Sequence, residues 1–229
     1  AWVWNEQRRR PQPEIVALML ERIDALPPLQ RGFLQRCASL GGRCSVAFDA
    51  ALSGSGIEET IRAASALVAA GLLRRSGDDF AIAHDRVLEA AYAALSPAQR
   101  ARAHLGNARL LAAESPAPDP DRAFEIAAQI ERCALDDLAA EERPRFAEIL
   151  LRAARTCRSA GEARRALHFI ELIRRLLPGD QPDALASLIF ATEGLQCDCL
   201  LALGRIDDAL AALEDLSRLA RDAEGIADI

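Results

Sequence analysis

The chain of 229 residues contains no lysine, and all 28 of its basic residues are arginine. A phosphate-binding loop of the GxxxxGK(S/T) type, the ATP-site lysine of a protein kinase and a Schiff-base lysine each require a lysine side chain. None of these sites can lie within this sequence. We therefore predict that the chain is not an enzyme by itself.

Aromatic residues are scarce, at 4% of the chain, whereas hydrophobic residues make up 51%. A core of mostly alanine and leucine, with few glycines and prolines, favours helices over a β-sandwich or barrel. No uncharged apolar run approaches the roughly 18 residues that a membrane span needs, and no signal peptide is recognisable. We expect a mainly α, cytoplasmic protein with no membrane segment. Because the first residue is Ala1 rather than methionine, we also expect an excerpt of a longer protein.

The cysteines form no CxxC pair and no cluster with histidine. Two of them, Cys197 and Cys199, are two residues apart and therefore fall on different faces of a helix. We predict buried free thiols in a reducing compartment rather than metal ligands. The six residues are Cys37, Cys44, Cys133, Cys157, Cys197 and Cys199.

Basic charge dominates neither half of the chain, whose formal net charge is −6. Residues 1–113 carry 14 Arg against 11 acidic residues, and residues 114–229 carry 14 against 23. Nucleic-acid-binding domains concentrate basic residues on one surface, so neither half resembles one. The balance changes near 114–122, where prolines at alternate positions disfavour a helix.

The first part of the chain reads as three helices followed by a hairpin. Apolar residues recur at helical spacing over 15–26, 29–40 and 57–72, and the Gly- and Ser-rich segment 41–56 is predicted to break this pattern. Residues 72–83 then read as a short β-hairpin, and a further helix follows. Three helices and a small hairpin are the order of a winged helix. We predict a winged-helix-like domain over 1–96.

The second part of the chain repeats with a period of 43 residues. Ala-Leu pairs at 166 and 209, and Gly161 and Gly204 before them, share this offset. Such self-similarity is typical of stacked helical hairpins. We predict tetratricopeptide-like antiparallel helix pairs, an α-solenoid, over 97–229, with both glycines between helices. The expected helices are 97–113, 123–138, 143–160, 163–177, 184–203 and 206–222.

Residues 80–92, with the sequence FAIAHDRVLEAAY, are followed by an Arg100 and His104 pair. This segment resembles the region after the ATPase core in bacterial multidomain STAND-class proteins, the signal-transduction ATPases with numerous domains. VALMLERIDALP at 16–27, LQRCASLG at 34–41 and Trp2-Val-Trp4 are similar to the same family. The HDRV form is closest to members that join a Ser/Thr kinase, this ATPase module and a histidine kinase.

The resemblance implies a regulatory role. In that family the ATPase domain binds nucleotide, the winged helix holds an inactive ADP-bound arrangement, and the helical repeats sense an inducer. By this likeness His84 would reach an ADP phosphate, with Asp85 beside it, and should lie exposed; alternatively both residues cap a helix that starts at Asp85. ATP or ADP and Mg²⁺ are expected only with the missing ATPase domain, and no cofactor is expected in this chain.

Other residues have simpler interpretations. For Arg100 and His104 we favour a solvated helix face with one semi-buried histidine, over a contact that fixes the winged helix against the first repeat. His168 is expected at an interface or in the core rather than as a ligand. Arg8-Arg9-Arg10 reads as a solvated linker, and Gly54-Ser55-Gly56 as a turn rather than a hydrolytic site.

The leading functional hypothesis is a non-catalytic sensor and interaction segment of a signalling ATPase or kinase. Its expected partners are its own ATPase and output domains and a protein or small-molecule inducer at the repeats. The alternative is a DNA-binding winged-helix regulator with a helical effector domain. The would-be recognition helix, 57–71, argues against DNA because it offers only Arg62, with Arg74 and Arg75 following in the hairpin. A scaffold that binds a peptide in its groove is a third reading.

Overall fold

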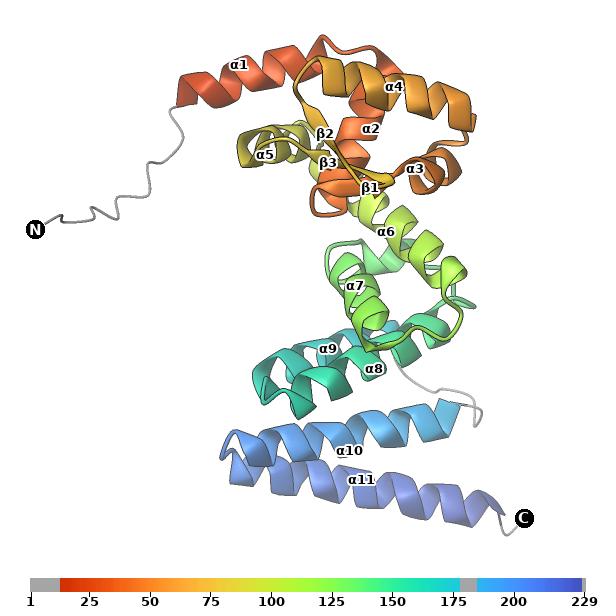
Figure 1. The fold of residues 1–229 in the computed structure, drawn as a ribbon. Coiled ribbons are helices and arrows are strands. Elements are labelled where there is room, and N and C mark those ends of the chain that lie inside the picture. The colour runs from red at the N-terminus through yellow and green to blue at the C-terminus, as the bar shows by residue number, and fades with distance from the viewer. Residues whose placement is uncertain (1–12, 178–184, 228–229) are drawn as a thin grey trace, which may run out of the picture. The chain divides into compact units, whose positions relative to one another are not determined.

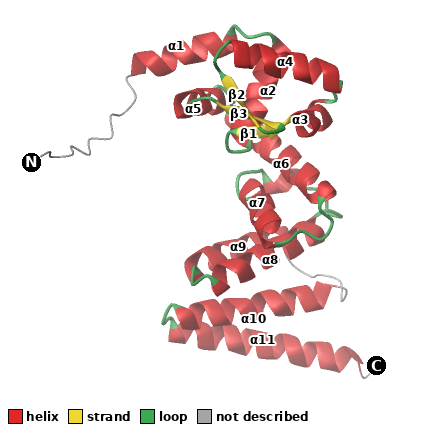
Figure 2. Cartoon of the chain, viewed as in Figure 1, coloured by secondary structure: helices red, strands yellow, loops and turns green. Residues whose placement is uncertain are grey.

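The structure is a computed structural model that describes residues 13–177 and 185–227. The predictions for Trp2, Trp4 and Arg8–Arg10 lie outside the described residues. The chain divides into two compact units, Ala1–Leu110 and Leu111–Ile229. As predicted, the fold is mainly helical with a small antiparallel sheet (Figures 1 and 2).

The first unit contains the sheet, and the long helix α6 begins in this unit. Its elements in chain order are α1 Pro13–Asp24, α2 Pro28–Ser39, β1 Arg43–Ser45, α3 Val46–Ser53, α4 Ile57–Ala69, β2 Leu73–Ser76, β3 Asp79–Ile82, α5 Asp85–Ala93 and α6 Pro97–Glu114.

The sheet has three strands in the described chain, where the sequence predicted only the hairpin β2–β3. Strand β3 lies in the centre, antiparallel to β1 on one side and to β2 on the other (Figure 2). Cys44 of β1 and Arg75 of β2 both pair with Phe80. Because β3 is central, its consecutive residues Phe80, Ala81 and Ile82 are all buried.

The prediction that 41–56 breaks the helical pattern holds for its ends and was wrong for its middle, because the segment contains the strand β1 and the helix α3. The Ser45 side chain accepts a hydrogen bond from the Phe48 amide at 3.0 Å and so caps α3. Gly54, at φ +70°, ends the helix. The residues read as turn formers are therefore the boundaries of a short helix, and Gly54-Ser55-Gly56 is the turn into α4.

A buried ion pair joins helix α3 to α2. The Asp49 carboxylate, which is fully buried, accepts hydrogen bonds from Arg36 Nε at 2.5 Å and from a terminal guanidinium nitrogen at 2.9 Å. Such bidentate pairing fixes both side chains in one geometry. Beside it, Phe33 of α2 meets Phe80 of β3 edge to face with ring centres 6.0 Å apart, so α2 is packed on the sheet as well as on α3.

The second unit consists of helices and one short 3₁₀ turn in its described residues. These elements are α7 Pro120–Ile130, η1 Leu135–Asp137, α8 Arg143–Ser159, α9 Ala163–Leu176, α10 Ala186–Ala202 and α11 Ile206–Ala227.

The helix predicted over 123–138 is wrong at both ends. Asp119 accepts a hydrogen bond from the Arg122 amide at 2.8 Å, and Pro120 occupies the first helical position, so α7 starts inside the proline-rich segment. The helix ends at Ile130. Beyond the end of the helix, Leu135 and Leu138 are buried. The apolar residues after Ile130 therefore reflect burial of a connection and not a longer helix.

The two glycines predicted between helices lie there. Gly161 and Gly204 have φ of +84° and +71°, a region that glycine enters without strain. Both turns close with the same bond from the amide that follows the glycine, Glu162 to the Cys157 carbonyl at 2.8 Å and Arg205 to the Leu200 carbonyl at 3.0 Å. The turns are therefore alike at an offset of 43 residues.

These turns join the helices into pairs that pack along the chain. Helix α8 packs on α7 and α9, α10 packs on α9, and α11 packs on α10 (Figure 1). The buried residues of this unit come mainly from α8 and α9 and include Leu150, Phe169, Ile170 and Ile173. Among the described residues, no helix combines the length and apolarity that crossing a membrane requires.

Candidate functional site

His84 lies where the chain leaves the centre of the sheet and turns into a helix. Just beyond the end of β3, the Ala83 amide donates a hydrogen bond to the Leu72 carbonyl at 3.0 Å. His84 then keeps an extended backbone, with φ −147° and ψ 145°, and α5 begins at Asp85. The sequence-based prediction of a helix starting at Asp85 is confirmed.

The side chains at this turn are exposed. His84, Asp85 and Arg86 all lie at the surface of the first unit, so the exposure predicted for His84 is present. The backbone N-cap of α5 is His84, and its imidazole makes no capping hydrogen bond. Asp85 sits in the first turn, where its charge favours the helix dipole. His84 and Asp85 therefore stand at the start of the helix, as the capping interpretation predicted, but His84 makes no side-chain capping bond and its side chain is exposed.

The end of α5 is tied to α6 by three side chains. The Tyr92 hydroxyl and His104 Nε2 are hydrogen-bonded at 2.8 Å, and His104 is buried. Arg100 donates to the Tyr92 and Ala93 carbonyls and stacks over the Tyr92 ring at 4.7 Å. The favoured interpretation of Arg100 and His104 as a solvated face was wrong. Helix C-terminal carbonyls attract a guanidinium, and the tyrosine hydroxyl supplies the partner that lets the imidazole be buried.

Helix α4, the segment weighed for DNA recognition, exposes apolar and acidic side chains. Ile57 and Ile61 are 50% and 44% exposed, and Glu58 and Glu59 lie beside them. Arg62 is the one arginine on this helix, and Arg74 and Arg75 are exposed on β2. Arg75 also stacks on the Phe80 ring at 5.6 Å. This surface lacks the density of positive charge that phosphate contacts require.

His168 belongs to a charged cluster on the second unit. Glu131, at the end of α7, accepts a hydrogen bond from Arg165 at 2.8 Å and lies 2.9 Å from His168 Nε2. The Arg165 guanidinium also stacks on the rings of Phe124 and Phe169. His168 is half-exposed and paired at the α7–α9 contact, as the interface interpretation predicted. The cluster joins these two helices through the ion pairs of Glu131 and the stacking of Arg165 on the two rings.

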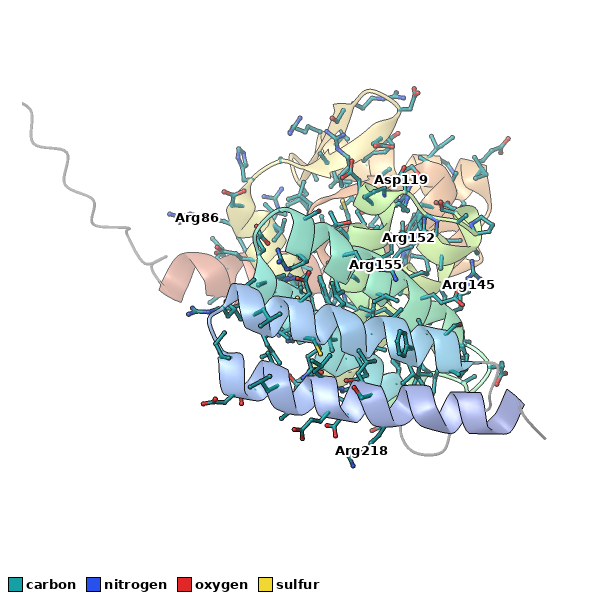
Figure 3. The ribbon with its side chains drawn as sticks, turned by 90° about the horizontal axis from the view of Figure 1, so that it is seen from below. Arg86, Asp119, Arg145, Arg152, Arg155 and Arg218 are labelled. Carbon is teal, nitrogen blue, oxygen red and sulfur yellow. The ribbon has the colours of Figure 1, made fainter. Side chains whose placement is uncertain are left out.

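Arginines of α8 bind backbone carbonyls in the last turn of α6 and in the proline-rich connection that leads to α7. Arg145 donates to the Ala112 carbonyl, and Arg152 donates to the Pro118 carbonyl at 2.7 Å. Both side chains, with Arg155, project from the same helix (Figure 3). Arginine suits this role because its fork of donors reaches backbone oxygens that no amide can satisfy at a proline-rich turn.

The thiols and the acidic residues offer no metal centre in the described residues, where no group of three His, Cys, Asp or Glu side chains gathers. None of the six cysteines forms a disulfide, and Cys133 alone is half-buried rather than buried. Burial, with the Asp49 carboxylate acting in the same direction, raises the pKa of the Cys37 thiol to about 12, and burial likewise raises the pKa of Cys44. Thiols that stay protonated are poor nucleophiles and poor ligands.

Sequence reasoning missed an apolar surface on α11. Ile206, Leu210 and Leu213 are each at least half exposed and lie at positions i, i+4 and i+7 of one helix face. The spacing was readable from the sequence, but periodicity alone cannot tell a buried stripe from an exposed one. A groove is lined by Leu210, Leu213, Glu214, Ser217 and Arg218; we call it the α11 groove.

Comparison of the chain with protein-family models, with curated proteins and with solved structures found no match.

Proposed function

We propose that this chain is a non-catalytic regulatory and interaction segment of a bacterial signal-transduction ATPase or kinase. The observation that carries the proposal is the order of elements from α2 to β3: helix, strand, helix, helix, strand, strand. Winged helices have the same order of elements, and strand β1 and helix α3, which the sequence did not reveal, therefore support the proposal. Helix pairs with like turns follow it, as the family resemblance implies for a sensor array.

In this proposal, nucleotide contacts the first unit only at the N-terminus of α5. The exposed imidazole of His84 stands at the N-terminus of α5, where free backbone amides favour anions. A phosphate of ADP held by an ATPase domain is the ligand that the resemblance implies for this position. That ATPase domain, with its lysine-containing phosphate-binding loop, would supply the rest of the nucleotide site and the Mg²⁺. The contact of α5 with α6, through Tyr92 and His104, supports a relay from this position toward the helical array.

The test is the replacement His84→Ala in the full-length protein that the proposal implies. The coding sequence upstream of Ala1 should contain a phosphate-binding loop and an acidic Walker B strand. We expect the variant to release ADP about tenfold more readily, because a hydrogen bond to a charged phosphate is lost, and to raise basal output. Glu89→Ala, which changes an exposed residue in the middle of the same helix, α5, is the matched control. Unchanged ADP affinity and output, or an upstream sequence without such a loop, would contradict the proposal.

The alternative of a DNA-binding regulator is disfavoured by the exposed face of α4. A recognition helix needs several cations near phosphates, whereas this face carries two isoleucines and two glutamates. We expect duplex affinity weaker than about 1 µM at low salt. Fluorescence anisotropy with a labelled duplex measures it. A sub-micromolar affinity that falls steeply with added salt would favour the alternative instead.

A further inference from the structure

Helix α10 is joined to the two helices before it by ion pairs at the surface. A terminal nitrogen of Arg158 on α8 donates a hydrogen bond to Asp198 Oδ1 at 3.1 Å, and Arg158 Nε lies 3.0 Å from Asp198 Oδ2. On α9, Arg174 pairs with Glu193 of α10. Helices α8 and α10 run in the same direction, since each ends at a turn on the same side of the second unit (Figure 1).

Two buried thiols lie next to the Arg158–Asp198 pair. Cys157 precedes Arg158 and is 3% exposed, and Cys199 follows Asp198 and is 0% exposed. Successive side chains of a helix differ in direction by about 100°. One cysteine is a step toward the N-terminus and the other a step toward the C-terminus, so they turn in opposite senses. On two parallel helices side by side, opposite turns bring both side chains from the rim into the contact between the helices.

The two helices can approach closely at this level. Ala153 and Ala154, one turn before Cys157 on α8, are both fully buried, and small side chains at a contact shorten the distance between helix axes. Burial raises the pKa of the Cys199 thiol, and the nearby Cys157 acts in the same direction. One thiol affects another in this way only over a short distance. A disulfide requires Cα atoms within about 7 Å of each other.

Burial decides when this pair of thiols can react. In the closed array both are covered and stay protonated, so they react slowly. Once α10 moves away from α8, the sulfurs meet solvent. Hydrogen peroxide then oxidises one thiol to a sulfenic acid and releases water, and the second thiol displaces another water to close the S–S bond. The sulfurs lose two electrons, the peroxide oxygens gain them, and both thiol protons leave in water.

We propose that Cys157 and Cys199 form a redox switch, in which a disulfide formed by a hydroperoxide locks α10 onto α8 and a thiol reductant releases it. In the reduced chain only non-covalent contacts hold α10 on α8, and in the oxidised chain the two helices move together. Cys197 is not part of the switch, because it packs against Ala209 and Ala212 of α11. The switch needs neither nucleotide nor an upstream domain, so its test is separate from that of the function proposed above.

Peptide mapping by mass spectrometry tests the pairing in the whole 229-residue chain. After treatment with hydrogen peroxide, we expect the Cys157–Cys199 disulfide to be the main product, and dithiothreitol should remove it. Hydrogen exchange of the α10 amides should be at least about tenfold slower in the oxidised chain, because the cross-link opposes the opening of α10.

Variants identify the thiols that matter. Cys199→Ser should abolish both the disulfide and the slower exchange. Cys197→Ser, the matched control two residues away, should retain both. Asp198→Asn should speed disulfide formation about two- to fivefold, because loss of an exposed ion pair eases the opening. A disulfide through Cys197, cross-links mainly between copies, or α10 exchange unchanged by oxidation would overturn the proposal. The mapping of the unmodified sequence decides even where a variant fails to fold.

Discussion

Replacing Arg36 with methionine is expected to lower the free energy of unfolding by about 3–5 kcal/mol. The substitution leaves the carboxylate of Asp49 without its two hydrogen bonds at a position that is fully buried. A buried charge without a partner is costly because neither water nor another donor stabilises it. Asp49→Asn should cost less, since Arg36 keeps some contact with solvent. Urea unfolding followed by circular dichroism at 222 nm measures both.

The double variant Arg36→Met/Asp49→Leu tests the cause. Removing both charges removes the unpaired carboxylate, so the double variant should be more stable than Arg36→Met alone. A double variant that is less stable than Arg36→Met would show that packing of the side chains, rather than the charge, sets the cost. A loss below about 1 kcal/mol for Arg36→Met, the range of an exposed pair, would contradict the prediction.

The stability of the first unit should fall steeply in alkaline solution. Burial raises the pKa of the Cys37 thiol from 9.0 to about 12 and raises that of Cys44 in the same direction. Above about pH 9 the unfolded chain releases these protons while the folded chain retains them. The unfolded state then binds fewer protons, so stability decreases as pH rises through this range. Each thiol contributes about 1.4 kcal/mol per pH unit.

The absence of lysine makes this effect easy to isolate, because lysine side chains normally dominate titration in the same range. Urea midpoints between pH 8 and pH 11 give the slope. In Cys37→Ala/Cys44→Ala the slope should flatten, whatever the variant costs at neutral pH. Cys133→Ala should retain the wild-type slope, because both buried thiols of the first unit remain. An equal slope in the double variant and the wild type would contradict the assignment.

The long helices were predictable because each carries an apolar stripe at helical spacing and a clear stop. Gly161 and Gly204 end their helices for a reason that is local, since their backbone conformations are left-handed. Strand β1 was not predictable in the same way. Its three residues become a strand only by pairing with β3, more than thirty residues later, and no pattern within Arg43–Ser45 reveals that partner.

In the candidate site, too, the features set by neighbouring residues were predictable and those set by distant residues were not. The exposure of His84 followed from its position between a strand and a helix, which are local features. The burial of His104 did not, because it depends on the hydroxyl of Tyr92 from the preceding helix. Similarly, the sequence placed Leu210 in register with Leu167 but could not tell that one is covered and the other open. That difference depends on which helix packs on each face.

The ion pairs of α10 have a consequence for how copies of this chain behave in solutions of different salt concentration. Glu193 of α10 pairs with Arg174 of α9, and Asp198 of α10 pairs with Arg158 of α8, and both pairs reach solvent. Ion pairs that reach solvent weaken as salt is added, whereas the apolar contacts between α8 and α9 do not depend on charge. Added salt should therefore loosen α10 from α8 and α9 before it loosens α8 from α9, and a copy of the chain with a loosened α10 exposes its buried residues to other copies.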